Sequence, residues 1–432
     1  MTSLPASDRR FVLVAGLFFL AALVLQLPGH VPYDGIVVWH EAETHTLYAQ
    51  HPAALVLIWR LCEAVMRGPA LVTALSLGVL WLAIGLLLQR HRPPLWAAAL
   101  FGLIVLLWPP LLATSAVAVK DVLGAHLVLL AMVLAKGERR GVWFAAFAAG
   151  TLAFLLRYQF GLVLPLLGVM AWRTENRTVL LAGLGGIVFT LVVVNALVAA
   201  LFVKTGPGDV MLSLRKIAIF DIAGTVVQDS STPLTILAAH RIATDTLKAE
   251  MIASYSPARV DTLWQTGESG TITPTSGVFG RLYALSDATI FAQWRATLGD
   301  RPGAFLAHRG AAFARVIGLG DIWQCRPLTL GISWLPRRAA QAVEAKSFAA
   351  PWSAQFGRML PVSLTFRVIA YLAVLAVILW TGPQEARLLA GFALLYELSF
   401  FFLPQACEVR YGYPVILAAV VAGAMALERR FV

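Results

Sequence analysis

The sequence predicts an all-α polytopic membrane protein with about ten transmembrane helices and a mostly helical insertion outside the cytoplasm. Hydrophobic residues make up 59% of the 432-residue chain, and the mean hydropathy is +0.77. Charged residues make up only 13%, against roughly a quarter in soluble domains. Most of the net charge of +11 lies in short connections between apolar segments, so we expect it to orient the protein in a membrane, with no nucleic-acid partner.

The apolar segments define the predicted spans, because about 20 apolar residues cross the hydrocarbon and shorter runs are tolerated among packed helices. The first span follows Asp8-Arg9-Arg10 and precedes Pro28-Gly29-His30, which offers no small-residue cleavage site, so we expect an uncleaved helix. The fifth and sixth spans are short, and a single broken hairpin is an alternative. The predicted spans are 11–27, 70–88, 95–115, 122–135, 142–156, 160–172, 178–202, 363–380, 388–404 and 413–427.

The basic residues of the short connections predict the orientation. Connections on the cytoplasmic side carry an excess of lysine and arginine. The side that holds both termini carries Arg9, Arg10, Arg90, Arg92, Lys136, Arg139, Arg140, Arg173, Arg177, Arg387, Arg429 and Arg430. The opposite side carries fewer, namely Arg60, Arg67, Lys120, Arg157 and Arg410. Both termini are therefore predicted to be cytoplasmic.

Three regions follow from this arrangement. Residues 1–203 form an N-terminal transmembrane module whose first outer loop is 28–69, residues 204–362 form the insertion, and residues 363–432 form the C-terminal helices. Within the first loop, residues 52–66 are apolar but carry Arg60 and Glu63, which favours an interfacial helix over a span.

The insertion contains one loop-like and one helix-like part. Residues 254–286 are rich in turn formers and predict a loop. Trp294 to Ile317 predicts a helix interrupted near Pro302, in which Trp294, Arg301, His308 and Arg315 recur every seven residues. Such a helix suits a membrane surface, with Phe305, Phe313 and Val316 dipping into the bilayer, or else it belongs to a small ordinary domain.

Small residues and cysteines give further expectations. Gly183, Gly185 and Gly186 lie inside a predicted span and indicate a close-packing helix face. The three cysteines lack metal-ligand spacing. Cys325 and Cys407 can pair if both lie outside the cytoplasm, leaving Cys62 free, and three unpaired thiols are an equal alternative.

Polar residues that are unusual for this composition gather on the predicted outer face. Asp34, Glu41 and His51 lie in the first outer loop, in the stretch YDGIVVWHEAETHTLYAQHP. Lys120 and Asp121 connect the third and fourth spans, Arg157 ends the fifth, and Arg410 and Tyr411 begin the last. Because ionisable groups at this depth are costly to bury, their convergence predicts a polar cavity.

The types of residue indicate the chemistry of this cavity. If 34–48 is helical, then Asp34, Glu41, His45 and Tyr48 share a face. Asp34 would act as a general base, with Glu41 as a helper, or Asp34 and Asp121 would hold a divalent cation (magnesium or manganese) or position the acceptor. Arg157 and Arg410 would stabilise a phosphate leaving group.

Each of these residues also has a structural interpretation. Asp34 can cap the helix that follows it, and Asp121 can cap its own helix with Lys120 as ion partner. Arg157 can extend to the membrane interface, as most terminal arginines of spans do. Glu408 and Arg410 can form a local salt bridge, and His51 before Pro52 can mark only a turn.

These phrases resemble those of the GT-C superfamily of integral-membrane glycosyltransferases, in particular uncharacterised bacterial proteins related to glycosyltransferase family 39. The matching phrases are Asp34 with His51-Pro52, Lys120-Asp121, Phe220-Asp221-Ile222-Ala223-Gly224, Trp294 through His308-Arg309, and Glu408-Val409-Arg410-Tyr411. Where relatives read Asp-Trp-His-Pro-Pro, this chain has Ala49-Gln50-His51-Pro52-Ala53.

The resemblance implies a GT-C-like fold and a multi-pass protein of the bacterial inner membrane whose large loop is periplasmic. It implies transfer of a sugar from a polyprenyl-phosphate donor to a lipid, glycan or protein acceptor. Asp34 then matches the first-loop acid that serves as catalytic base or positions the acceptor, and Asp121 matches the second-loop acid. We expect substrate contacts from His51, Lys120, Arg157, Arg410, Tyr411, His308 and Arg309.

Two other functions remain as alternatives. One is a polymerase or ligase of lipid-linked glycans, which also combines many spans with a large outer loop. The other is a transporter or flippase for lipid-linked precursors, although transporters place ionisable groups near the middle of the membrane and the predicted spans here are almost charge-free there. The sequence has no phosphate-binding glycine loop for a nucleotide.

Overall fold

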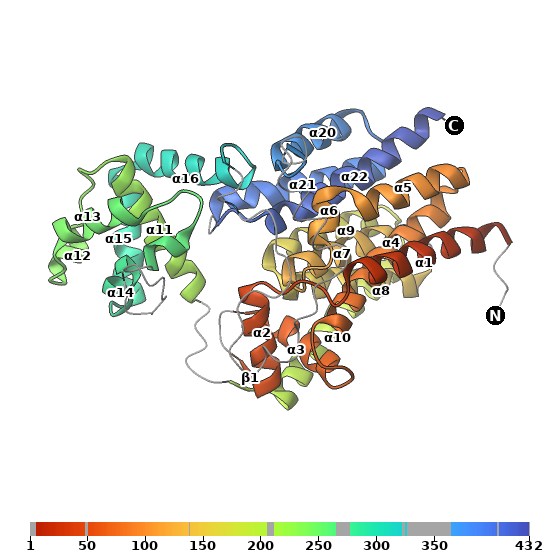
Figure 1. Cartoon of the computed structure of the whole chain (residues 1–432), viewed down its shortest axis with the longest axis horizontal. Helices are drawn as coiled ribbons and strands as arrows, with labels where there is room; N and C mark the ends of the chain where they lie inside the picture. Colours follow the sequence, from red (N-terminus) through yellow and green to blue (C-terminus); the bar gives the residue numbers. More distant parts are fainter. Residues whose placement is uncertain are drawn as a thin grey trace. The chain divides into compact units, whose positions relative to one another are not determined.

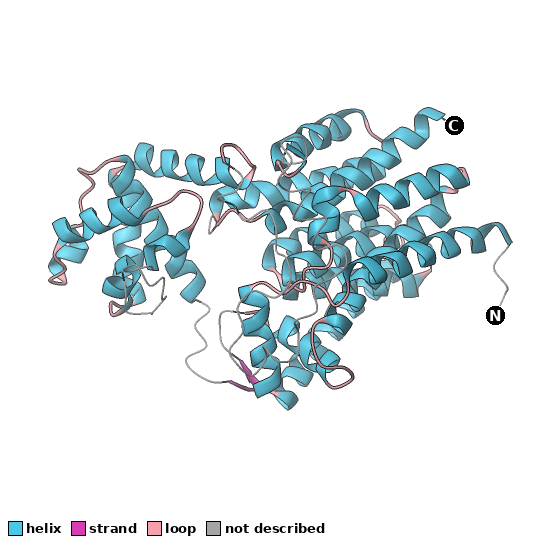
Figure 2. Ribbon diagram, viewed as in Figure 1, coloured by secondary structure: helices cyan, strands magenta, loops and turns pink. Residues whose placement is uncertain are grey.

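The computed structural model confirms the all-α class (Figures 1 and 2). In the part of the chain that the structure describes, two strands of two residues each accompany the helices. Contacts divide the chain into two compact units. The second unit comprises Pro207–Arg326 and Glu397–Glu408, and the first comprises the remainder. The structure describes residues 6–47, 51–137, 139–204, 211–264, 277–321, 325, 364–403 and 406–431. The predicted end of the insertion at residue 362 lies outside the described residues.

The first unit is a helical bundle with α7 (Lys120–Leu134) at its centre. This helix packs against α4, α8 and α22, and 12 of its 15 residues are buried. The other elements are α1 (Ala6–Gln26), α2 (Tyr33–Thr44), β1 (Thr46–Leu47), α3 (Ala53–Glu63), α4 (Ala70–His91), α5 (Leu95–Leu107), α6 (Pro109–Thr114), α8 (Arg140–Leu156), η1 (Tyr158–Leu162), α9 (Val163–Trp172), α10 (Arg177–Leu201), β2 (Val203–Lys204), α20 (Val368–Thr381), most of α21 (Gln384–Phe402) and α22 (Val409–Phe431).

Two short elements close one end of this bundle. Helices α2 and α3 pack on each other, and Figure 1 shows them at the end where α1 finishes. β1 pairs with β2 in parallel, with Thr46 opposite Val203, which joins the end of α2 to the end of α10. The segment predicted as an interfacial helix, 52–66, forms α3, which ends at Glu63.

The apolar helices indicate a membrane protein, but ten spans are not confirmed. Among the described residues, four helices are long and apolar enough to cross a bilayer: Arg9–Gln26, Ala70–His91, Arg177–Leu201 and Val409–Leu427. Four shorter apolar helices cover Leu95–Leu107, Arg140–Leu156, Tyr158–Trp172 and Val368–Thr381. The predicted span 95–115 is divided because α5 ends before Pro109 and Pro110, and proline disfavours a helical conformation in the residue before it.

Two of the three glycines in α10 provide the close-packing face that the sequence predicts. A Cβ atom on Gly183 would meet the ring of Phe147, and one on Gly186 would meet the backbone carbonyl of Phe144. Helix α10 therefore approaches α8 more closely than any larger residue would allow.

The second unit is built around α11 (Met211–Gln228). This helix packs against α13, α15 and α16, and its buried residues, such as Phe220 and Ile222, join a continuous apolar core. The other elements are α12 (Thr235–Ala239), α13 (Thr244–Ser254), η2 (Val260–Trp264), α14 (Gly277–Tyr283), α15 (Asp287–Asp300) and α16 (Pro302–Val316). The loop predicted over 254–286 is wrong for η2 and α14, while 265–276 lie outside the described residues.

The helix predicted over Trp294 to Ile317 is interrupted where expected, since α15 ends at Asp300 and α16 begins at Pro302. The expectation that Phe305 and Val316 dip into a bilayer is wrong, because both side chains are buried within the protein. His308 is fully buried against α11. Two members of the predicted polar face, Trp294 and His308, meet Asp221 inside the unit, whereas Arg301 is partly exposed and pairs with Asp229. Helix α16 is thus part of a compact helical unit.

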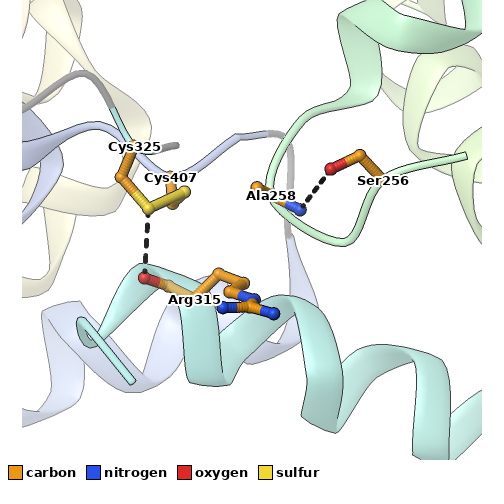
Figure 3. The surroundings of a disulfide bond; sticks show 5 residues. All are labelled: Ser256, Ala258, Arg315, Cys325 and Cys407. Atoms are coloured by element: carbon orange, nitrogen blue, oxygen red, sulfur yellow. Dashed lines mark hydrogen bonds between the residues drawn. A yellow bond between two sulfur atoms is a disulfide. The ribbon is translucent and has the colours of Figure 1, made fainter. Parts of the chain in front are cut away.

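Cys325 and Cys407 form a disulfide, which decides between the two alternatives for the cysteines, and Cys62 stays free and buried (Figure 3). The backbone N–H of Cys407 donates to the Ala258 carbonyl at 2.8 Å. The Cys325 sulfur lies 3.6 Å from the Arg315 carbonyl at the end of α16. The disulfide thus holds together three segments of the second unit that are distant in sequence.

Candidate functional site

Two loops of the first unit are tied together at the end of the bundle where α2 and α7 begin. The N–H of His30 donates to the Ala116 carbonyl at 3.0 Å, and the N–H of Ala118 donates to the His30 carbonyl at 2.8 Å. Gly29 has φ +101°, and a Cβ atom there would collide with Thr73. The glycine permits both this backbone conformation and the close approach, so the start of α2 is fixed near the start of α7.

The first ion pair of the site joins Asp34 to Arg410. Asp34 lies in the first turn of α2, Arg410 lies at the start of α22, and their Oδ2 and Nη2 atoms are 2.7 Å apart. The Asp34 side chain is 42% exposed, whereas that of Arg410 is 7% exposed. Burial raises the pKa of the Asp34 carboxyl, but Arg410, Lys120 and His51 together hold this pKa well below its usual value. Asp34 is therefore an ionised carboxylate that solvent can reach.

The second ion pair joins Asp121 to Arg157 and is closed to solvent. Asp121 lies in the first turn of α7 with a fully buried side chain, and Arg157 follows the last residue of α8. The Arg157 Nε atom also donates to Gln159 Oε1 at 2.7 Å. The interpretation of Arg157 as extending to the interface is wrong, because its side chain turns inward to a carboxylate. The capping role for Asp121 is also wrong, since Val119 occupies the N-cap position and Asp121 lies inside the first turn of α7.

Tyr411 connects the two ion pairs. The Arg157 guanidinium carbon lies 4.6 Å from the centre of the Tyr411 ring, and that of Arg410 lies 5.3 Å from it. Both distances are within the range of cation–π attraction. Asp34, Arg410, Tyr411, Arg157 and Asp121 thus form one continuous row built from α2, α22, α8 and α7.

A third acid lies on α2 at the predicted face. Glu41 is fully buried, and its Oε1 atom lies 3.4 Å from His51 Nδ1, just before α3. The predicted face ends there, because α2 stops at Thr44 and His45 adopts a left-handed conformation with φ 54°. The His45 ring instead contacts the Leu201 carbonyl at 3.0 Å. Tyr48, predicted on the same face, lies outside the described residues.

One further structural interpretation from the sequence fails here. Asp34 is not an N-cap, since Pro32 occupies that position and Asp34 is already inside the helix. Arg410 pairs with Asp34 across 376 residues of sequence.

The residues present do not fit a divalent cation. Asp34 and Asp121 each face an arginine, and a metal ion would have to displace these guanidinium groups. Within the described ranges, no group of three or more His, Cys, Asp or Glu side chains is placed to hold an ion.

His308 and Arg309, predicted to contact substrate, belong to a network inside the second unit. The Asp221 carboxylate accepts hydrogen bonds from Trp294 Nε1 at 2.7 Å and from Arg309 Nη2, and it lies 3.1 Å from His308 Nε2. The His308 Nδ1 atom lies 2.7 Å from the Tyr255 hydroxyl. Asp221 and His308 are fully buried.

Gly224 makes this network possible. It lies three residues after Asp221 on α11, about one helical turn further along. A Cβ atom at this position would occupy the space of the His308 ring. The phrase Phe220 to Gly224 therefore supplies a carboxylate and the room for its histidine partner.

Sequence reasoning missed two members of these clusters. Gln159 follows Arg157 by two residues, a spacing that could have suggested a local hydrogen bond. Tyr255 gave no signal, because it lies in a segment predicted as a loop.

No family model matches the chain, and neither the curated proteins nor the solved structures contain a match.

Proposed function

We propose that this protein is a membrane glycosyltransferase that moves a sugar from a polyprenyl-phosphate donor to a lipid, glycan or protein acceptor. The observation that carries this proposal is the row from Asp34 to Asp121. It combines one accessible ionised carboxylate with two arginines whose positions are fixed by ion pairs and a shared aromatic ring. The resemblance of the same residues to GT-C glycosyltransferases supports the choice of reaction.

In the proposed reaction, an acceptor hydroxyl attacks the anomeric carbon of the sugar and displaces the polyprenyl phosphate with inversion. Asp34 accepts a hydrogen bond from this hydroxyl and takes its proton as the new C–O bond forms. The lowered pKa of Asp34 suits a proton transfer that is late, when the attacking oxygen has become strongly acidic.

Arg410, which belongs to the row, and Lys120, which does not, act on the leaving group. When the sugar–oxygen bond breaks, its electron pair stays on the phosphate oxygen, so negative charge grows there. Arg410 and Lys120, which already face Asp34, supply positive charge for this oxygen. Asp121 is buried and does not touch substrate in this proposal. It is a positioning residue that holds Arg157 and, through the Tyr411 ring, Arg410.

Replacing Asp34 tests the proposal directly. Asp34→Asn keeps the shape of the side chain but removes the base, and we expect transfer from a polyprenyl-phosphate sugar to fall by a factor of about 10²–10⁴. The assay uses the full chain in detergent at matched expression. Asp229→Asn, at an exposed ion pair of the second unit, is the control that should keep full activity. Wild-type activity in Asp34→Asn would contradict the assignment of Asp34 as base.

The orientation is a second part of the proposal. We propose a bacterial inner-membrane protein with both termini in the cytoplasm and the second unit in the periplasm. In this arrangement the shorter apolar helices also cross the membrane, packed among the longer ones. The Cys325–Cys407 disulfide supports this, because disulfides persist in oxidising compartments and are rare in the cytosol.

Thiol counting tests the orientation. In acid-trapped, denatured samples from cells, a maleimide should label one thiol, Cys62, before reduction and all three after it. In Cys325→Ser, Cys62 and Cys407 should both be labelled without reduction. Three labelled thiols in unreduced wild-type samples would place the second unit in a reducing compartment.

The two alternative functions, a polymerase or ligase and a transporter or flippase, predict different experimental results. A polymerase or ligase leaves lipid-linked oligosaccharide to accumulate when the gene is deleted. A transporter or flippase moves the intact precursor across vesicles, and this movement would survive Asp34→Asn.

A further inference from the structure

A basic cavity of about 520 Å³ lies at the end of the first unit opposite the candidate site. It is lined by the end of α7, the beginning of α8, the end of α9, and the beginnings of α10 and α21. The candidate site uses the other ends of α7 and α8. Because α7 has 15 residues and a helix rises 1.5 Å per residue, the two places are about 22 Å apart.

The cavity carries surplus positive charge. Lys136 and Arg173 line it, and the two connections that contain them, 135–141 and 173–177, hold five basic and two acidic residues. The Lys136 ammonium lies 3.4 Å from Glu385 Oε1, so the carboxylate partly neutralises its charge. Arg173 is exposed, and its guanidinium forms no ion pair within the described part of the chain. Arg173 is therefore the cation that is available to a ligand.

Neutral donors and an apolar floor complete the cavity. Asn176 Oδ1 accepts hydrogen bonds from the Thr178 N–H at 3.0 Å and from its hydroxyl at 2.6 Å, which leaves the Asn176 amide NH₂ to donate. Trp143 is only 2% exposed and lines the cavity with Met170 and Val179. A ligand that fits has an anionic part for the rim and an apolar part for the floor.

We propose that this cavity binds a phosphate group, supplied by an anionic membrane lipid or by free phosphate. A phosphate accepts charge-assisted hydrogen bonds from a guanidinium and an ammonium together, with the Asn176 amide as a further donor. Basic pockets between membrane helices bind the headgroups of anionic lipids by this chemistry. The proposal does not depend on the glycosyltransferase assignment, since binding is measured without sugar transfer.

The test measures binding to the full chain in detergent by native mass spectrometry and by the shift of the thermal unfolding midpoint. The probes are phosphatidylglycerol, phosphatidylcholine and inorganic phosphate. We expect phosphatidylglycerol to bind and to raise the midpoint, while phosphatidylcholine, which has no net charge, binds more weakly. Arg173→Gln should weaken binding about fivefold, as expected for one basic residue near an anionic headgroup.

Arg387→Gln is the matched control. It also removes one positive charge near the beginning of α21, but Arg387 does not line the cavity, so binding should not change. Stabilisation by inorganic phosphate alone, lost in Arg173→Gln, assigns the site to free phosphate. Stabilisation by phosphatidylglycerol alone assigns it to lipid. Equal binding of the two lipids, or equal effects of Arg173→Gln and Arg387→Gln, would overturn the proposal.

Discussion

The row of the first unit and the network of the second are made from the same kinds of residue and differ in exposure. In the row, Asp34 faces Arg410 with a side chain that is 42% exposed. In the network, Asp221 faces Arg309, His308 and Trp294 and is fully buried. Every partner of Asp221 is a group of the protein itself. Asp34 keeps one side open to another molecule.

The difference in exposure indicates that the row around Asp34 is a candidate binding site and that the network around Asp221 is part of a structural core. A buried charge needs partners that satisfy it completely, and removal of one partner leaves the others unpaired. An exposed pair costs little to break because water replaces the lost partner. The sequence motifs alone gave His308 and Arg309 the same role as Arg410. All three side chains are buried, and the exposure of the acid that each one meets, Asp221 or Asp34, now distinguishes them.

The largest expected effect is on the buried network. Asp221→Asn leaves Arg309 and His308 without their anion, and we expect a loss of about 3–5 kcal/mol in the stability of the second unit. Hydrogen exchange of peptides from α11 and α16 measures this in the full chain. Asp229→Asn breaks an exposed pair with Arg301 and should leave the exchange nearly unchanged. Equal exchange in both variants would show that the network does not hold the unit together.

A smaller effect is expected from the glycine that makes room for His308. Gly224→Ala places a methyl group against the His308 ring, and the overpacking should cost about 1–3 kcal/mol. The control is Gly310→Ala on α16, where a Cβ atom meets nothing within 4 Å. There the gain in helix propensity should be neutral or stabilising by up to about 1 kcal/mol. Thermal unfolding of the two variants compares them, and a stable Gly224→Ala would mean that the histidine moves freely.

The smallest effect on stability is expected at Asp34. Its lowered pKa means that its ion pair stabilises the folded protein above the unfolded pKa of about 4, and this contribution is lost as the pH falls through the folded value. Asp34→Asn should therefore lower stability by about 1 kcal/mol or less between pH 5 and 8. Below pH 4 the difference from the wild type should shrink. Midpoints measured from pH 3 to 8 test this, and a large loss would make Asp34 a structural residue like Asp221.

Local signals predicted several parts of the fold correctly. The sequence placed a helix interruption near Pro302, and α16 begins at this proline. The number of spans was harder to predict from the sequence, because a hydropathy pattern does not show that Pro109 divides one apolar segment into two helices. In the second unit, the periodicity of α16 was clear, but the same pattern fits a helix facing a membrane and a helix facing an acidic partner.

The candidate site shows the same limit. The sequence supplied Asp34, Asp121, Arg157, Arg410 and Tyr411 as a set on one predicted face. Periodicity extended the face of α2 to His45 and Tyr48, whereas the helix ends at Thr44 and His45 adopts a left-handed conformation. Local reasoning also offered near neighbours as partners, Lys120 for Asp121 and Glu408 for Arg410, and the main ion pairs are long-range.

By itself, the sequence determined the helical class, the apolar segments and the identity of the ionisable residues, because these depend on composition and local periodicity. The tertiary structure decided which acid meets which base and which of them solvent can reach. It paired Asp34 with Arg410 across 376 residues and joined Cys325 to Cys407. Pairing and burial depend on contacts between segments distant in the chain, and a single sequence does not encode these contacts in any local pattern.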